Sequence, residues 1–316
     1  NCDGVKDGLA IPSSVTAIGE YAFAYSTGFD GKLTIEANDG LTIGRYAFYE
    51  TTFNAVEIGD GTLSIGNCAF YNCSSISGDL VIPDSVTSIG NYAFYRCTGL
   101  NGTLKLSENL TSIGDYAFYD CSNIQGELVI PDKLTTVEDW VFENMDGITS
   151  VVIGASVKNI YSSFYGCDSI KEMTFLGTTP SSSNPFYGIG TALETVYVPA
   201  ESYGEYSTAY KTYLPTGVRM TAIGAEGDFL VNDGVLTAYL GEGGEVAIPN
   251  GVTVIGTGAF QNCATVTKIT MPDSVTKIES YAFCNCAELA EIELSTALED
   301  IEENAFKDCV KLESIE

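Results

Sequence analysis

One phenylalanine recurs along this chain at an almost constant interval. Its positions are Phe23, Phe48, Phe70, Phe94, Phe118, Phe142, Phe164 and Phe186, and then Phe260, Phe283 and Phe306. Adjacent copies are 22 to 25 residues apart, except for one interval of 74 residues. A unit this short cannot bury its own apolar face, so burial must come from stacking on similar neighbours. The spacing therefore predicts a solenoid.

The phenylalanine belongs to a longer shared pattern. Most copies follow C-x-x-I-x-G-x-L-x-I-P-x-x-V-x-x-I-G-x-x-A-F, as in the stretch from Cys73 to Phe94. The apolar residues of L-x-I have a period of two, so both point inward and the residue between them points out. The proline ends the strand because it has no N–H to donate to a sheet. Each unit is thus predicted to contribute one short strand to a growing sheet.

This unit resembles the leucine-rich repeat of the BspA type, whose pattern L-x-L-P-x-x-L-x-x-I-G-x-x-A-F-x-x-C-x-x-L matches most copies. The resemblance covers nearly the whole chain. It implies a leucine-rich-repeat solenoid, a right-handed curved superhelix that is mainly β with short helical or 3-10 turns and a parallel sheet on the concave face. Members of the family are typically secreted or cell-surface proteins of bacteria and some protists, associated with adherence. The resemblance therefore implies an extracellular or cell-surface location.

Composition excludes several classes of function. The net charge is −28, with 14 Lys and Arg against 42 Asp and Glu, so binding to nucleic acid or to an anionic membrane surface is not expected. No apolar run is long enough to span a bilayer. There is no histidine, which removes Ser-His-Asp and Cys-His catalysis and His-containing zinc sites. No pair of carboxylates is marked by a break in the repeat. We therefore expect no enzyme, no catalytic residue, no cofactor and no metal.

The cysteines follow the repeat. Seven of the 10 lie three residues after the phenylalanine: Cys73, Cys97, Cys121, Cys167, Cys263, Cys286 and Cys309. Cys2 fits the same column if the first unit is cut at its start. A free cysteine inside a stack acts as a small buried apolar residue, and this interpretation is favoured over disulfides or a redox or metal role. Cys68 and Cys284 lie off the column and are expected to be more exposed.

The long interval between Phe186 and Phe260 predicts a junction between two arrays. Residues 200–213 place Tyr203, Tyr206, Tyr210 and Tyr213 on one face of a helix, which would cover the open end of the first array. Asp233-Gly234 lies between two alternating runs, which indicates a hairpin at about 228–240. The predicted domains are a first array over 1–222 with its helical cap, and a second over 223–316 with a hairpin cap, expected to be truncated at its end.

The outward column of the predicted strands is one candidate ligand face. Its predicted ligand contacts are Val81, Lys105, Val129, Val152, Thr174 and Tyr197, and the column also includes Thr34, Glu57, Ala247, Thr270 and Glu293. An extended protein partner could dock on the central valines. The alternative is that β-branched residues are present only because they suit strands.

Tyrosines form a second candidate face. The residue after the phenylalanine is Tyr49, Tyr71, Tyr95, Tyr119, Tyr165 or Tyr187, and the residue two before it is Tyr21, Tyr46, Tyr92, Tyr116, Trp140 or Tyr281. Of these, Tyr49, Tyr71, Tyr95, Tyr119 and Tyr165 are predicted ligand contacts. Tyrosine has an apolar body and a polar tip, so such rows suit contacts with a protein or a glycan. They equally suit a half-buried edge on which repeat packs against repeat.

The sequence alone thus favours a non-enzymatic binding or adhesion module. Its expected partner is a host or microbial surface protein or glycan, without nucleic-acid binding and without membrane insertion of this stretch. The alternative is a structural spacer that presents another domain of a larger surface protein.

Overall fold

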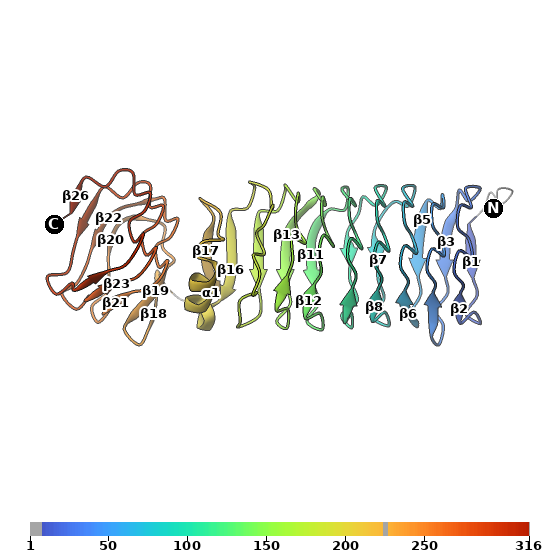
Figure 1. Cartoon of the computed structure of the whole chain (residues 1–316), viewed down its shortest axis with the longest axis horizontal. Coiled ribbons are helices and arrows are strands. Elements are labelled where there is room, and N and C mark those ends of the chain that lie inside the picture. Colours follow the sequence, from blue (N-terminus) through green and yellow to red (C-terminus); the bar gives the residue numbers. More distant parts are fainter. Residues whose placement is uncertain (1–7, 224–226, 316) are drawn as a thin grey trace. The chain divides into compact units, whose positions relative to one another are not determined.

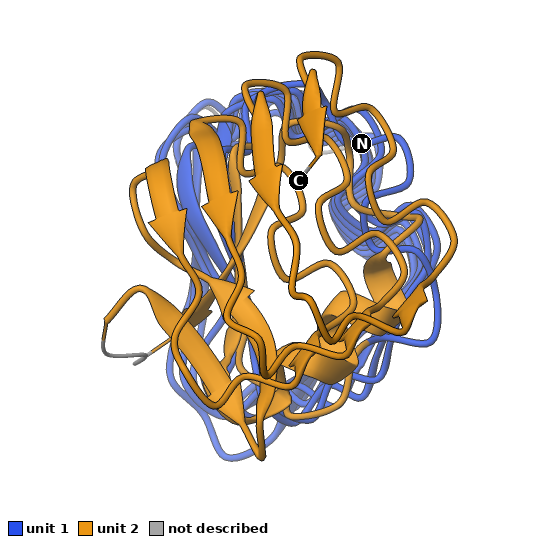
Figure 2. Ribbon diagram, turned by 90° about the vertical axis from the view of Figure 1, so that its left-hand side faces the viewer, with its two compact units in different colours: residues 1–173, 181–193 blue, residues 174–180, 194–316 orange. Residues whose placement is uncertain are grey.

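The computed structural model describes residues 8–223 and 227–315, which form the stacked coils of a parallel β-solenoid with little helix and about 13 turns. This confirms the predicted fold class. The chain divides into two compact units, one of residues 1–173 and 181–193 and the other of residues 174–180 and 194–316 (Figure 2). The predicted boundary at residue 222 stays a prediction.

The first unit has two rows of short strands, which Figure 1 shows as stacked turns. One row holds the strands of the L-x-I motif: β1 (Leu9–Ile11), β3 (Lys32–Ile35), β5 (Ala55–Ile58), β7 (Leu80–Val81), β9 (Leu104–Lys105), β11 (Gly126–Ile130) and β13 (Ile148–Ile153). The other row holds β2 (Ala17–Ile18), β4 (Leu41–Ile43), β6 (Thr62–Ile65), β8 (Ser88–Ile89), β10 (Ser112–Ile113), β12 (Thr136–Val137) and β14 (Asn159–Ile160). β15 (Glu172–Phe175) lies across the division between the units.

Strand register repeats the sequence register. In the L-x-I row of the first unit, β1 pairs with β3, β3 with β5, β7 with β9 and β11 with β13, each in parallel. The register aligns Leu9 with Leu33 and Val81 with Lys105. In the other row Ile65 pairs with Ile89, which pairs with Ile113. Because each position meets its own equivalent one turn on, every column of the sequence becomes a column in space.

The phenylalanine column forms the centre of the core. Phe70, Phe94 and Phe118 are fully buried. Their rings stack nearly parallel, with centroids 5.0 Å apart for Phe70 and Phe94 and 5.1 Å apart for Phe94 and Phe118. Stacking at this spacing adds a contribution on the order of 1 kcal/mol per pair to the burial of the rings. The stack explains why no smaller residue replaces this phenylalanine.

Two corner residues of a typical turn have left-handed backbone. In the turn around Phe94 they are Tyr92, with φ of 58°, and Arg96, with φ of 57°. This conformation costs about 1–2 kcal/mol for a residue with a Cβ. Part of the cost is offset because the corner pairs with the next turn: Phe94 N–H donates to the Ala117 carbonyl at 2.7 Å.

The second unit combines a helical segment with a smaller solenoid. The segment consists of β16 (Thr195–Pro199), η1 (Ala200–Ser202), α1 (Tyr203–Tyr210) and β17 (Arg219–Ile223). The solenoid rows are β18 (Phe229–Asn232), β19 (Val235–Tyr239), β21 (Val254–Ile255), β23 (Lys277–Ile278) and β25 (Asp300–Ile301), and β20 (Gly244–Ala247), β22 (Val266–Thr270), β24 (Glu291–Glu293) and β26 (Ser314–Ile315).

The helix and the hairpin lie in the predicted segments. Tyr203, Tyr206 and Tyr210 are buried along α1, whereas Tyr213 lies beyond the end of the helix and is 41% exposed. β18 and β19 pair antiparallel through Asp233-Gly234, both at positive φ. The assignment of these segments as caps stays a prediction.

Candidate functional site

The outward strand column places its central members on neighbouring turns. Val81 is 52% exposed and Val129 is 48% exposed, although their strand neighbours point into the core. Lys105 lies in register with Val81, and Val152, which is half-buried, lies in register with Val129. Thus the period-two rule places these four side chains on one face of the first unit. Thr174 and Tyr197 are half-buried and belong to the second unit.

A shallow groove of about 410 Å³ follows the carboxyl ends of β3, β5 and β7. Val81 and Lys105 line it together with Glu36, Asp60 and Asp84. The strand face is therefore bordered by carboxylates. Sequence reasoning missed this groove because three of its acidic residues, Glu36, Asp60 and Asp84, come from the turns after the strands, outside the columns that define the repeat. Its fourth, Glu57, belongs to the outward strand column.

The first aromatic column, defined as the tyrosines directly after the repeated phenylalanines, is a continuous stack in its first half. Ring centroids are 4.9 Å apart for Tyr49 and Tyr71, 4.7 Å for Tyr71 and Tyr95, and 4.8 Å for Tyr95 and Tyr119, with nearly parallel planes. Neighbouring rings cover each other's faces, so the column presents ring edges and hydroxyls to solvent. This geometry favours the packing interpretation for these four tyrosines.

The same column is interrupted by Glu143, which follows Phe142. Beyond it, Tyr165 is 40% exposed and Tyr187 is 57% exposed, and their rings are tilted by 43° with centroids 6.1 Å apart. The structure therefore separates Tyr165 from the four stacked tyrosines with which it was predicted to act.

The second aromatic column, two residues before the repeated phenylalanines, occupies the left-handed corner. Tyr116 has φ of 57° and Trp140 has φ of 61°, and the first of the equivalent residues in the second unit is Gly258, with φ of 66°. Glycine adopts this backbone without strain, whereas an aromatic residue here has a conformational cost that its contacts must offset. Ring stacking supplies part of this compensation, since the ring centroids of Tyr92 and Tyr116 are 5.0 Å apart.

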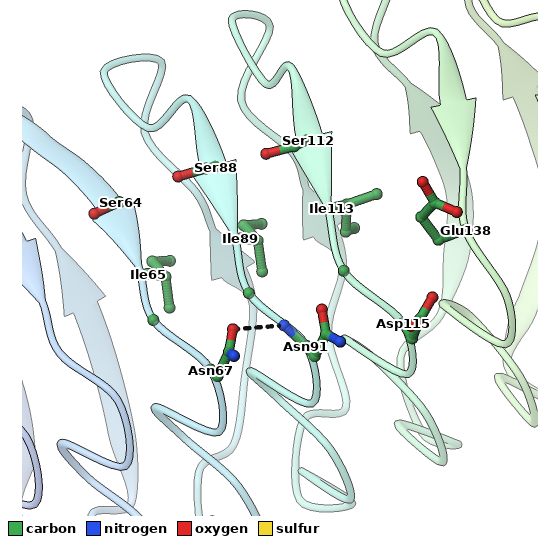
Figure 3. Close-up of a pocket in the computed structure, with 13 residues that line it drawn as sticks. Ser64, Ile65, Asn67, Ser88, Ile89, Asn91, Ser112, Ile113, Asp115 and Glu138 are labelled. Carbon is green, nitrogen blue, oxygen red and sulfur yellow. Dashed lines mark hydrogen bonds between the residues drawn. The ribbon is translucent and has the colours of Figure 1, made fainter.

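A polar groove of about 560 Å³ runs along the other strand row (Figure 3). Its lining repeats S-I-G-N from Ser64 and Ser88, and ends at Glu138. Asn67 accepts the backbone N–H of Asn91 at 3.1 Å, and a Cβ on Gly90 would collide with Asn67. The glycine and asparagine are thus a stacking device, which could have been read from their paired recurrence.

The cysteine column forms a ladder of buried donors. Cys97 Sγ donates to the Phe70 carbonyl at 3.1 Å, and Cys121 Sγ donates to the Phe94 carbonyl at 3.1 Å. Burial raises the pKa of Cys121 to about 12. Every cysteine between residues 8 and 315 is a free thiol. This agrees with the predicted structural thiols, while Cys2 lies outside the described residues.

The expectation for the two cysteines outside the column was wrong. Cys68 is only 9% exposed and Cys284 only 4%, whereas Cys309, within the column, is partly exposed. Burial raises the pKa of both thiols. The column neighbours of both cysteines are longer side chains: Tyr46 and Tyr92 for Cys68, and Gln261 and Lys307 for Cys284.

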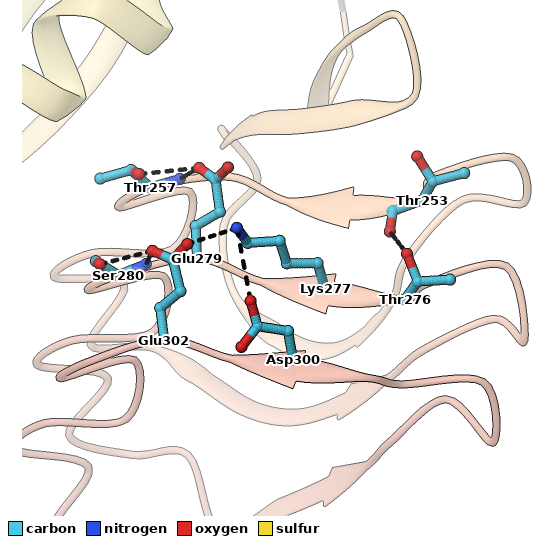
Figure 4. Close-up of polar contacts among 8 residues, drawn as sticks. All are labelled: Thr253, Thr257, Thr276, Lys277, Glu279, Ser280, Asp300 and Glu302. Atoms are coloured by element: carbon cyan, nitrogen blue, oxygen red, sulfur yellow. Dashed lines mark hydrogen bonds and ion pairs between the residues drawn. The ribbon is translucent and has the colours of Figure 1, made fainter.

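Ion pairs and hydroxyl–carboxylate contacts connect turns of the second unit (Figure 4). Lys277 Nζ lies 2.6 Å from Glu302 and 3.6 Å from Asp300. Glu302 also accepts the N–H and the hydroxyl of Ser280, at 3.0 and 2.8 Å. Lys277 and Ser280 lower the pKa of Glu302 to about 2. These carboxylates are used by the stack itself, so they are poor candidates for catalysis.

Within the described ranges, three or more His, Cys, Asp or Glu side chains nowhere gather in a way that could hold a metal ion. No helix in the same ranges is both long and apolar enough to cross a membrane. The site candidates are therefore the grooves and columns of a parallel β-solenoid repeat protein.

The family model for the BspA type leucine rich repeat region matches the chain in six copies, over residues 1–103, 41–171, 100–212 and 242–316. The chain belongs to this family. A search of curated proteins returned no match.

Solved structures with a similar fold include leucine-rich repeat proteins of bacteria. A leucine-rich cell surface protein from Faecalibacterium prausnitzii is 21% identical over 99% of this chain and 87% of its own, with a TM-score of 0.41. A leucine-rich repeat protein from Bacteroides ovatus is 21% identical over 99% and 79%, with a TM-score of 0.41. The pneumococcal vaccine antigen PcpA is 18% identical over 69% and 68%, with a TM-score of 0.43.

Proposed function

We propose that this chain is a non-enzymatic binding module of the cell surface that holds a protein or glycan partner on its solenoid surface. The observation that carries the proposal is the exposure of Val81 and Val129 in the outward strand column, with Lys105 on the turn between them. Exposed β-branched residues on a sheet face with a charged border are better suited to contact with an extended partner than to contact with water. Membership of a repeat family supports the proposal.

The test is a binding assay with extracellular-matrix and cell-surface preparations, using the whole chain and the variants Val81→Asp and Val129→Asp. We expect the variants to lose at least about tenfold in affinity, since a charge is placed in an apolar contact. Their thermal stability should stay close to the parent's, because both side chains are already about half exposed.

The matched control is Val310→Asp, which makes the same change at a side chain that is 79% exposed in the second unit. It should leave binding unchanged. Equal binding by all three variants would contradict the assignment of the strand face. If the parent chain binds none of the preparations, the spacer function is favoured instead.

A further inference from the structure

The turn around Phe142 departs from the repeat at the two aromatic columns. Trp140, the only tryptophan of the chain, replaces the tyrosine of the second column. Glu143 replaces the tyrosine of the first column. Local departures from an otherwise consistent repeat are where function is most often found. This turn changes both columns at once, and the changes introduce a larger ring and a negative charge.

The two replacements line one groove. This aromatic groove has a volume of about 370 Å³ and is lined by Tyr92, Tyr95, Tyr116, Tyr119, Trp140 and Glu143. The ring spacing widens here: the centroids of Tyr116 and Trp140 are 6.3 Å apart with planes tilted by 16°, against 5.0 Å for Tyr92 and Tyr116. Trp140 also meets Tyr165 in an edge contact, with centroids 5.7 Å apart. The next residue of the first column is Glu143, so no ring of that column covers the far face of Tyr119. The groove therefore offers ring surface beside a carboxylate.

Two arginines of the chain lie over tyrosines of the aromatic columns. The guanidinium of Arg45 lies 4.6 Å from the ring centroid of Tyr46. That of Arg96 lies 5.8 Å from the centroid of Tyr95 and pairs with Asp120 at 3.1 Å. Over residues 8–223 and 227–315, no Lys or Arg of the chain is found over Tyr116, Tyr119 or Trp140. Arg96 thus borders the groove at Tyr95, where it is already paired with Asp120. At the other end of the groove, Trp140 and Glu143 repeat the ring-and-carboxylate arrangement, and none of the described Lys or Arg side chains lies over that ring.

Charge at the groove is negative. Burial, and then the neighbouring Asp120, raise the pKa of Glu143. Burial raises the pKa of Tyr116 as well, with added contributions from Glu143 and Asp139. Partly buried carboxylates that repel one another are stabilised when a cation approaches. Indole is the best of the aromatic rings for such a cation.

We propose that the aromatic groove binds an arginine side chain from a basic segment of the partner protein, with the guanidinium against the rings of Trp140 and Tyr119 and paired with Glu143. Arginine fits better than lysine because its planar group can stack on a ring and still donate to a carboxylate. This inference rests on the proposed binding function and assigns to it a protein partner with exposed arginine.

Trp140 supplies the readout, since it is the only tryptophan. The whole chain is titrated with an Arg-Gly repeat peptide at physiological salt while tryptophan emission is recorded, and a Lys-Gly peptide of the same length is compared. We expect a saturable change in emission and tighter binding of the arginine peptide. Glu143→Tyr, which introduces the residue that six other turns have at this position, should weaken binding about tenfold.

Glu127→Gln is the matched control, because it removes one exposed negative charge on β11 at a position outside the groove. It should change affinity less than about twofold, as expected for a surface charge. Equal weakening by both variants would mean that the peptide responds only to net charge, and would overturn the proposal. Unchanged emission of Trp140 during the titration would overturn it as well.

The cell-surface assay separates this proposal from the proposed function. If Glu143→Tyr loses both the peptide and the surface partner, the groove is the partner contact. If it loses the peptide but retains the surface partner, that role of the groove is overturned while the proposed function stands. If the parent chain binds no surface preparation, the proposed function fails, and the peptide titration still decides whether the groove binds arginine.

Discussion

At the scale of single residues, the repeated cysteine is a hydrogen-bond donor as well as a small apolar side chain. Cys121 Sγ donates to the Phe94 carbonyl at 3.1 Å and is fully buried. Its pKa is raised by burial to about 12, so on the order of one thiol in 10⁴ is ionised at pH 8. The thiolate is the reactive form, and the column should therefore be chemically inert in the folded chain.

We predict that the native protein resists thiol reagents. In a Cys2→Ser variant at pH 8, only Cys309, which is partly exposed, should react within minutes. The remaining thiols should react after unfolding in guanidinium chloride, which serves as the control for reagent activity. The measurement is the stoichiometry of released chromophore against time. Rapid labelling of several thiols in the native state would contradict the buried ladder.

At the scale of the element, the start of β11 is shaped by a glycine. The register between β11 and β13 shifts between Gly126 and Glu127, and Gly126 has φ of 86°. A Cβ at this residue would meet only Thr103 Cγ2, at 4.0 Å. Space is therefore available, and the requirement for glycine is purely one of backbone conformation.

We expect Gly126→Ala to lower the free energy of unfolding by about 1 kcal/mol or more, because alanine is strained at positive φ. Gly19→Ala is the matched control, since a Cβ there would have open space and the φ of Gly19 is not positive. That variant should be neutral or slightly more stable. Both are measured by denaturant unfolding, and equal destabilisation would contradict the conformational explanation.

At the scale of the whole molecule, charge repulsion opposes a core that is otherwise regular. The net charge is −28, while ion pairs such as Lys277–Glu302 are partly exposed. Each pair of this kind contributes about 1 kcal/mol or less. Repulsion among so many unpaired carboxylates acts on the entire compact state and is screened by salt. We therefore expect the net effect of these charges on the free energy of unfolding to be destabilising.

The melting temperature should accordingly rise when NaCl is increased from about 10 mM to about 300 mM, where the Debye length falls well below 10 Å. Thermal unfolding followed by circular dichroism measures the change. Sodium chloride is preferable to sulfate, which would also strengthen apolar burial. A fall in melting temperature with salt would show that attractive pairs dominate.

The repeat columns made much of the fold predictable. Val81 and Val129 point outward and Phe94 is buried because parallel stacking repeats each position in space. The prediction for Cys68 failed because the length of neighbouring side chains, not its own column, decides its exposure. The aromatic groove was missed because Trp140 and Glu143 look like separate irregularities until their columns are seen to lie side by side.

The sequence by itself determined the solenoid, the parallel pairing, the inward and outward faces and the buried phenylalanine and cysteine columns. These follow from periodicity, since a repeated unit buries its apolar residues only on its own copies. Only the tertiary structure decided which columns adjoin, that the aromatic corner residues have left-handed backbone, and that the ring spacing widens at Trp140 beside Glu143. Those features depend on distances between side chains in different columns, which a one-dimensional pattern does not contain.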